Sequence, residues 1–252
     1  MTTRTVFLTG ASSGIGESLA RLYASRGYQL GLVARRKDHL ERLATEITPR
    51  PVIYAIDVRD IDGLKNAATD FISRHGVPDI VIANAGVSRG TLTGMADDLK
   101  TFQEIFDINV IGMVNTFHPF VEPMSKAGKG TLVGIASVAG FRGIPGGGAY
   151  SASKAAAIRY CESLRVELRS AGVSVVTICP GYIRTPMTAV NKFKMPFLID
   201  VDEAVVRFAR AIDARTSFTV IPWSMGIAAR ILRLVPNWLY DRVFSRMPRK
   251  PR

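Results

Sequence analysis

The sequence is poor in cysteine, in histidine and in long apolar runs. Its two cysteines, Cys161 and Cys179, lie in apolar segments, where reduced buried thiols are expected rather than a disulfide framework. No uninterrupted apolar run reaches the roughly 18 residues that a bilayer-spanning helix needs. The N-terminal MTTRTVFLTG lacks the cationic and then apolar layout of a secretion signal. We therefore expect a cytoplasmic protein, and we expect no metal site.

Acidic residues are also scarce, because 33 Lys and Arg residues accompany 21 Asp and Glu residues, for a formal net charge of +12. Such an excess favours anionic partners: nucleic acid, a membrane surface or a phosphorylated cofactor. Half of it falls in residues 224–252, where seven cations accompany Asp241 alone. The charge is largely a property of this tail, and no recognised nucleic-acid-binding module is present, so we expect no nucleic-acid partner.

What the chain does have is a regular alternation of apolar, β-branched segments with segments of helical periodicity. The apolar segments are mostly apolar throughout, as in a parallel sheet covered on both faces. The alternation predicts an α/β fold: a single doubly wound Rossmann-type domain with a seven-stranded, mainly parallel sheet. The expected strands are 5–9, 29–34, 52–56, 80–83, 131–135, 173–178 and 218–221. The expected helices are 14–26, 38–47, 61–75, 101–125, 150–170 and 202–214.

The segment TGASSGIG, residues 9–16, ends the first expected strand and opens the first helix. It fits the G-x-S-x-G elbow of a serine hydrolase, and it also fits a glycine-rich turn that holds a dinucleotide phosphate. A hydrolase of that type needs a histidine late in the chain, but the last histidine is His118. A phosphate turn needs only glycines that admit a pyrophosphate and a helix N-terminus that faces it. We therefore expect the dinucleotide to contact Gly10, Ser12, Ser13, Gly14, Ile15 and Gly16.

Later motifs follow in a familiar order: NAG at 84–86, Asn109, Ser137, YSASK at 150–154 and PGYIRT at 180–185. Over about residues 4–221 the chain resembles the short-chain dehydrogenase/reductase family. The resemblance implies an NAD(P)-dependent oxidoreductase that reversibly reduces a ketone or aldehyde to an alcohol. It also implies a homodimer or homotetramer, because the helices at 101–125 and 150–170 resemble those that pair subunits in the family. The further cofactor contacts that it implies are Asp57, Val58, Asn84, Ala85, Gly86, Tyr150, Lys154, Pro180, Gly181, Ile183 and Thr185.

The choice between NAD and NADP depends on the residues after the second strand. An acid about 20 residues past the glycines suits the ribose of NAD, whereas an arginine there accommodates the 2′-phosphate of NADP. This sequence has Arg35 and Arg36 there, followed by Lys37, and no acid before Asp38. A guanidinium can hold a phosphate through two hydrogen bonds. We therefore favour NADP(H), the alternative being a solvated basic start to the next helix.

Tyr150 and Lys154 lie four residues apart on a helical pattern and so share a face. A free tyrosine, with a pKa of about 10, is a poor acid at neutral pH. An adjacent ammonium stabilises the phenolate and lowers that pKa, so the pair is suited to donating a proton to a carbonyl oxygen. Ser137 would hold the substrate oxygen, and the resemblance assigns Asn109 to a water that links Lys154 to solvent. The alternative is a sensor or scaffold protein that binds the cofactor without turnover.

Two segments remain outside these motifs. Residues 186–201 resemble a mobile lid over the substrate and belong to the catalytic domain expected at 1–222, and their Met and Phe residues suggest a hydrophobic small molecule as substrate. Residues 223–252 form a basic, amphipathic C-terminal extension. Its apolar helical face, with Arg230, Arg233 and Trp238, suits peripheral contact with a membrane. The alternative, which we favour because surface helices more commonly bury their apolar faces in protein, is a subunit contact or a cover over the substrate entrance.

Overall fold

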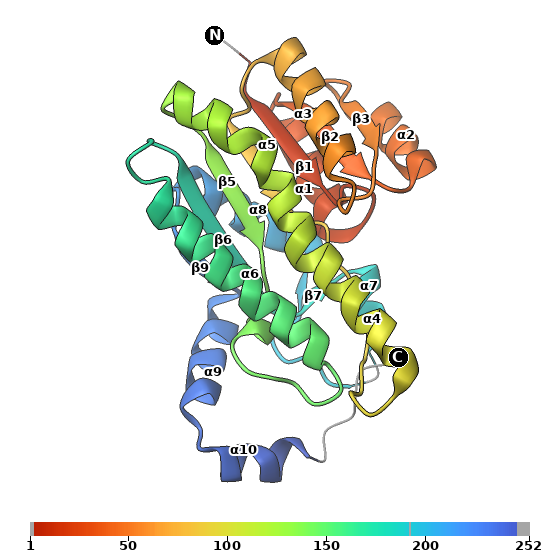
Figure 1. The fold of residues 1–252 in the computed structure, drawn as a ribbon, viewed down its shortest axis with the longest axis vertical. Helices are drawn as coiled ribbons and strands as arrows, with labels where there is room; N and C mark the ends of the chain where they lie inside the picture. The colour runs from red at the N-terminus through yellow and green to blue at the C-terminus, as the bar shows by residue number, and fades with distance from the viewer. Residues whose placement is uncertain (1–2, 192, 246–252) are drawn as a thin grey trace.

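The computed structural model describes residues 3–191 and 193–245. Its centre is a seven-stranded sheet in the order β3-β2-β1-β4-β5-β6-β9 (Figure 1). Every pairing in that sheet is parallel, which confirms the predicted doubly wound architecture. The strands are β1 (Thr5–Thr9), β2 (Gln29–Ala34), β3 (Val52–Ala55), β4 (Ile80–Ala83), β5 (Thr131–Ile135), β6 (Ser174–Pro180) and β9 (Phe218–Ile221).

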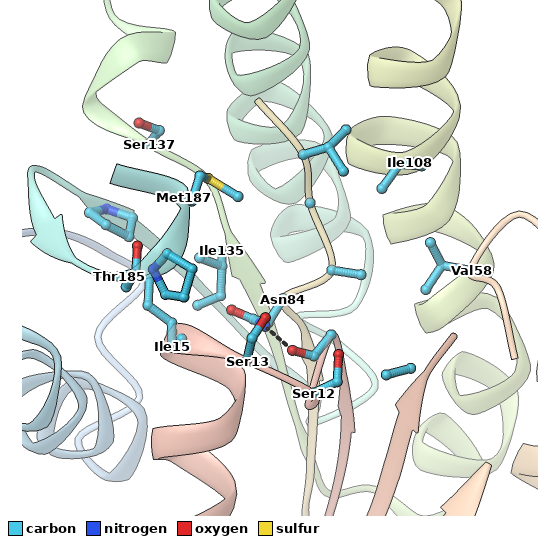
Figure 2. Close-up of a pocket in the computed structure, with 18 of the residues that line it drawn as sticks. Ser12, Ser13, Ile15, Val58, Asn84, Ile108, Ile135, Ser137, Thr185 and Met187 are labelled. Carbon is cyan, nitrogen blue, oxygen red and sulfur yellow. Dashed lines mark hydrogen bonds between the residues drawn. The ribbon is translucent and has the colours of Figure 1, made fainter. Parts of the chain in front are cut away.

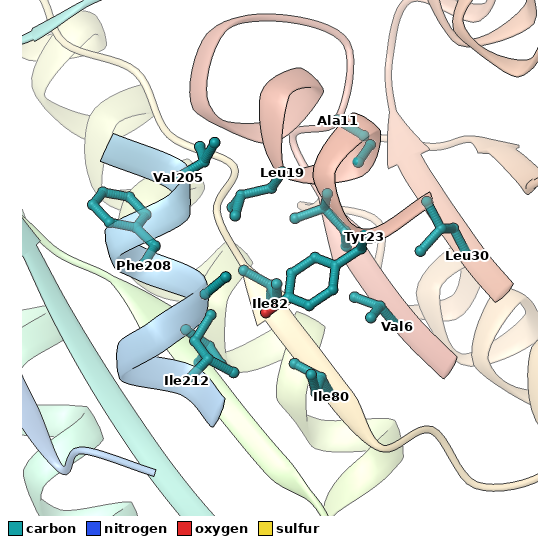
Figure 3. Close-up of a cluster of buried hydrophobic side chains, with 14 of the residues drawn as sticks. Val6, Ala11, Leu19, Tyr23, Leu30, Ile80, Ile82, Val205, Phe208 and Ile212 are labelled. Atoms are coloured by element: carbon teal, nitrogen blue, oxygen red, sulfur yellow. The ribbon is translucent and has the colours of Figure 1, made fainter. Parts of the chain in front are cut away.

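Helices cover both faces of the sheet. One face carries α1 (Gly14–Ser25), α2 (Lys37–Glu46) and α8 (Val201–Asp213), and the other carries α3 (Ile61–His75), α5 (Gly112–Ala127) and α6 (Gly148–Glu167). On the first face, Tyr23 of α1 and Phe208 of α8 are fully buried in one cluster with Ile82 of β4 (Figure 3). On the second face, the ring of Phe7 lies 5.6 Å from that of Phe71 and 4.7 Å from that of Phe120. Burial on both sides explains why the strands are apolar throughout.

The helix expected at 101–125 is longer and less regular than the periodicity indicated. It comprises α4 (Ala96–Phe106), the π-helical turn η1 (Asp107–Ile111) and α5. A π-helical turn often marks a functional site, because the extra residue re-aims the side chains of that turn. In this chain η1 contains Asn109.

The topology places the candidate site. From β1 the chain winds outward through β2 to β3, and it then returns to β4 beside β1 and winds the other way to β9. The helices after β1 and β4 therefore lie on opposite faces, which leaves a crevice at the carboxyl ends of these strands. Ligands of doubly wound sheets bind in that crevice.

Two short segments frame this edge. After the 3-10 turn η2 (Val138–Gly140), the loop 141–147 leads to α6, and after β6 the chain forms β7 (Ile183–Arg184), α7 (Pro186–Ala189) and β8 (Ile199–Asp200). The C-terminal helices α9 (Trp223–Leu234) and α10 (Asn237–Phe244) lie together at one end of the molecule (Figure 1). Among the helices of the described residues, none is long and apolar enough to cross a membrane. The basic end of the predicted C-terminal extension, residues 246–252, lies outside the described residues.

Candidate active site

A cavity of about 600 Å³ opens at the carboxyl ends of the strands, where the winding reverses. Figure 2 shows Ser12 and Ser13 at the start of α1, with Thr185 and Met187 on one side of the cavity and Val58 and Ile108 on the other. The lining contains every predicted cofactor residue except Gly16, and it contains Ser137, Tyr150 and Lys154. The two predicted residues that do not line it, Gly16 and Asn109, are buried behind it.

The glycine-rich turn brings the N-terminus of α1 against the end of β1. Gly10 has a left-handed backbone, with φ of 72°, which favours glycine. A Cβ on Gly16 would lie 2.1 Å from the carbonyl oxygen of Gly10, so the helix starts too close to the turn for any side chain there. Nδ2 of Asn84 donates to the carbonyl oxygens of Thr9 at 3.1 Å and Gly10 at 3.2 Å. Asn84 therefore braces the turn from β4.

The first turn of α1 can receive an anion. Among the described residues, the side chain of the N-cap residue Ser13 makes no capping hydrogen bond to this turn. The first backbone N–H groups of an α-helix have no partner within the helix, and the helix dipole adds positive potential there. Gly14 and Ile15, the first residues of the helix, line the cavity. This cradle of glycines and amides fits the pyrophosphate of a dinucleotide.

Arginines lie at the end of the cavity that is next to the carboxyl ends of β2 and β3. Nη2 of Arg36 donates to the hydroxyl of Ser12 at 3.0 Å and to its carbonyl oxygen at 3.2 Å. Nη1 of Arg35 lies 3.8 Å from Oδ2 of Asp57, and Nη2 of Arg59 donates to the same oxygen at 2.7 Å. Arg59, and more weakly Arg35, hold the pKa of the Asp57 carboxyl below its usual range. Arg59 is absent from the predicted site, although its position two residues after Asp57 could have indicated this pairing.

Ser137 and Tyr150 meet at the other end of the cavity. The Ser137 hydroxyl follows β5 and accepts a hydrogen bond from the backbone N–H of Ala139 at 3.1 Å. Burial raises the pKa of Tyr150, and a hydrogen bond with Ser137 lowers it in part. The sequence predicts that Lys154 lowers this pKa. In the structure burial outweighs the hydrogen bond with Ser137 and leaves the Tyr150 pKa above its ordinary value, and the lowering by the Lys154 ammonium stays a prediction.

Lys154 is buried beneath this pair. Its Nζ donates to the carbonyl oxygen of Ile135 at 2.9 Å and lies 5.9 Å from the centre of the Tyr150 ring. Burial lowers the pKa of Lys154 to about 8. Lys154 is therefore mostly protonated at neutral pH, but it binds its proton less tightly than an exposed lysine does.

Asn109 joins three elements behind the cavity. Its Oδ1 accepts from the backbone N–H of Val87 at 2.8 Å, and its Nδ2 donates to the Val87 carbonyl oxygen and to the Ser153 hydroxyl, each at 3.0 Å. A Cβ on Gly86 would lie 3.2 Å from Oδ1 of Asn109 and 3.5 Å from Nζ of Lys154. Asn109 and Lys154 therefore border the same glycine. The expected water link between them stays a prediction.

Sequence reasoning missed several lining residues, chiefly apolar ones beside the predicted positions. They carry no chemical signature of their own, so only adjacency to a motif could have indicated them. These residues are Ala34, Ile56, Val87, Ile108, Ile135 and Ala136.

The segment expected to form the lid does border the cavity, since its α7 supplies Pro186, Met187 and Thr188 to the lining. The hydroxyl of Thr188 donates to the carbonyl oxygen of Ile183 at 2.6 Å and closes the capping box of α7 with Thr185. These bonds hold the beginning of the segment beside the site. Lys192, within the same segment, lies outside the described residues.

Comparison with known proteins gives a consistent result. A family model described as short chain dehydrogenase matches residues 4–195. An uncharacterized oxidoreductase of Myxococcus xanthus is 38% identical over 255 residues, which cover 98% of each chain. A short chain dehydrogenase of Burkholderia cenocepacia, solved in complex with NADP, is 27% identical with a TM-score of 0.82, and the match covers 98% of each chain.

A further solved structure has the same fold but a different cofactor. The short chain dehydrogenase/reductase of Burkholderia phymatum, in complex with NAD, has a TM-score of 0.83 at 22% identity and covers 99% of this chain and 98% of its own. Structures with this fold therefore hold either cofactor.

Proposed function

This chain belongs to the short-chain dehydrogenase/reductase family of NAD(P)-dependent oxidoreductases, and we propose that it uses NADP(H) to reduce a ketone or aldehyde reversibly to an alcohol. The observation that carries the choice of cofactor is the position of Arg36. Its guanidinium is already bonded to Ser12 in the glycine-rich turn. It therefore lies between the pyrophosphate cradle and the end of β2, where a ribose 2′-phosphate would be recognised.

The electrostatics around Asp57 support the same cofactor. An acid that receives the ribose hydroxyls of NAD is needed at the end of β2, and this chain has Arg35 and Arg36 there. Asp57 follows β3 instead, and its carboxylate is already paired with Arg59 and lies near Arg35. Two guanidinium groups at this end would neutralise a phosphate dianion.

The proton chemistry follows from Tyr150, Ser137 and Lys154. When bound, a dihydronicotinamide cofactor would supply the hydride that the carbonyl carbon receives. The Tyr150 hydroxyl donates its proton to the carbonyl oxygen, which Ser137 orients by a hydrogen bond. The resulting phenolate is stabilised by the Lys154 ammonium, which is buried and therefore acts in a medium of low dielectric. Asn109 holds Lys154 in position, because it donates hydrogen bonds both to Ser153 of α6 and to Val87 in the turn after β4.

The proposed substrate is a hydrophobic small molecule. Val87, Ile135 and Met187 line the cavity that also holds Tyr150, and each presents an apolar side chain. Apolar walls with a few convergent polar groups are typical of sites for small organic ligands.

The test is a titration of the purified protein with NADPH and with NADH, followed by nicotinamide fluorescence. We expect tighter binding of NADPH, and a loss of about 10- to 100-fold in NADPH affinity in an Arg35→Ala/Arg36→Ala variant, with little change for NADH. Lys37→Ala is the matched control, because Lys37 is exposed and paired with Glu41. Tighter binding of NADH by the parent would overturn the choice of cofactor. Binding of both without carbonyl reduction would favour the sensor alternative.

A further inference from the structure

The helix α9 presents its large apolar side chains outward. Trp223, Ile227, Ile231 and Leu234 recur at intervals of four, four and three residues, which places them on one face of a helix. Their exposed fractions are 71%, 47%, 58% and 83%. A surface helix ordinarily turns such a face toward the core.

The inward face of α9 buries only a few side chains. Met225, Gly226 and Ala229 are its buried residues. A Cβ on Gly226 would lie 3.0 Å from Cβ of Val220, so α9 packs closely against β9 through its glycine. The fold therefore holds α9 by its narrow face and leaves its wide apolar face for another surface.

The helix α10 also exposes large apolar side chains. Trp238, Leu239 and Val243 are 69%, 37% and 55% exposed. Figure 1 shows α9 and α10 as adjoining helices at the end of the molecule, with α10 turned away from the direction of α9. We call the seven residues together the C-terminal apolar surface: Trp223, Ile227, Ile231, Leu234, Trp238, Leu239 and Val243. Large exposed apolar surfaces usually contact another body.

Arginines border this surface. Arg230 and Arg233 of α9 and Arg242 of α10 are exposed, and Asp241 is the one acid in the described part of the extension, residues 223–245. Arg230 and Arg233 also line a second cavity of about 720 Å³, to which α6 contributes Arg159, Arg165 and Glu162, with Arg159 paired to Glu162. The potential around the surface is therefore positive. Because two copies of this surface would bring arginines against arginines, a second copy of the chain is a poor occupant.

We propose that the C-terminal apolar surface docks on an anionic lipid bilayer. Two exposed tryptophans suit the boundary between headgroups and acyl chains, and the flanking arginines suit lipid phosphates. Since no helix of the described residues is long and apolar enough to span a bilayer, the contact is made in the plane of the interface. The extension thus holds the enzyme on the surface of a membrane.

The test is vesicle flotation of the full chain with phosphatidylcholine vesicles and with vesicles that also contain phosphatidylglycerol. We expect binding to the anionic vesicles that weakens with salt. Ile231→Ser should weaken it about tenfold. Val166→Ser is the matched control, because Val166 is 63% exposed on α6, and it should have no effect.

A second pair of variants separates the described arginines from the cations at 246–252. Arg230→Gln/Arg233→Gln should lose about 25-fold in affinity, at about fivefold for each arginine. The control Arg42→Gln/Arg74→Gln, on α2 and α3, removes the same charge elsewhere, and its loss of vesicle affinity should be much smaller. Equal affinities of parent and Ile231→Ser would overturn the proposal. So would a loss of self-association in Ile231→Ser with vesicle binding unchanged, since that result would assign the surface to a second copy.

Discussion

The guanidinium of Arg142 lies over the ring of Tyr240, with Cζ 3.8 Å from the ring centre. The Tyr240 hydroxyl in turn donates to the carbonyl oxygen of Gly143 at 2.6 Å. Arg142 also donates to the carbonyl oxygens of Leu232, in the last turn of α9, and of Val235, its C-cap residue. The two residues therefore join the C-terminal extension to the loop 141–147, the segment that separates Ser137 from Tyr150 in the chain.

We expect Arg142→Ala to lower the free energy of unfolding by about 2–3 kcal/mol. The variant loses the cation–π contact and leaves two carbonyl oxygens at the end of α9 without their donor. It should also raise KM for a carbonyl substrate, because the loop beside the site loosens, while NADPH affinity is unchanged. Urea unfolding and steady-state kinetics measure these effects. Arg74→Ala, which removes an exposed pair with Asp70, is the control and should cost less than about 1 kcal/mol. An Arg142→Ala variant as stable as this control would contradict the stabilising role of the contacts that Arg142 makes with Tyr240 and α9.

We expect Tyr150→Phe to retain NADPH binding and to lose turnover by about 10²- to 10⁴-fold, since only the acidic hydroxyl is removed. Fluorescence titration and initial rates on a panel of ketones and aldehydes separate the two properties. Tyr160→Phe is the matched control on the same helix, because the Tyr160 ring stacks near Phe117, away from the cavity. Carbonyl reduction by Tyr150→Phe at the parent rate would refute the assignment of the acid.

We expect Lys154→Met to be inactive but more stable than the parent at pH 7, by roughly 1–3 kcal/mol. The pKa of Lys154 falls from the ordinary value of 10.5 to about 8 in the fold. Below pH 8 both the folded and the unfolded chain hold the proton, so the folded state bears the whole cost of burying an ammonium. As the pH rises from 8 to 10.5, the folded chain releases the proton while the unfolded chain keeps it. Parent stability therefore increases relative to Lys154→Met across that window.

Urea unfolding at pH 7 and at pH 9.5 measures this difference. The advantage of Lys154→Met should shrink at the higher pH, whereas Lys126→Met, at an exposed lysine paired with Glu122, should show no such change. A Lys154→Met variant less stable than the parent at pH 7, or a stability advantage that is independent of pH, would contradict the prediction. Either result would show that burying the Lys154 ammonium does not destabilise the folded state.

Local sequence pattern was sufficient for the sheet and for most of the site. All seven expected strands form, because runs of apolar β-branched residues have few alternatives in a covered parallel sheet. The motif residues come together because each follows a strand or lies on a helix after one, and the carboxyl ends of parallel strands meet at one edge. The pattern failed where the period is irregular or the element is short. It missed the first residues of α4, the π-helical turn at η1 and the short elements β7 and β8.

By itself the sequence determined the fold class, the glycine-rich turn and the set of polar side chains at the candidate site. These depend on residue type and on spacing along the chain. The tertiary structure decided how those groups behave: that Ser137 lowers the pKa of Tyr150 against the effect of burial, that Asn109 is bonded to Val87 and Ser153, and that Arg142 reaches Tyr240. It also decided that α9 turns its glycine inward and its tryptophan outward. Burial and hydrogen bonding between residues far apart in the chain are properties of their packed arrangement, and no local pattern encodes them.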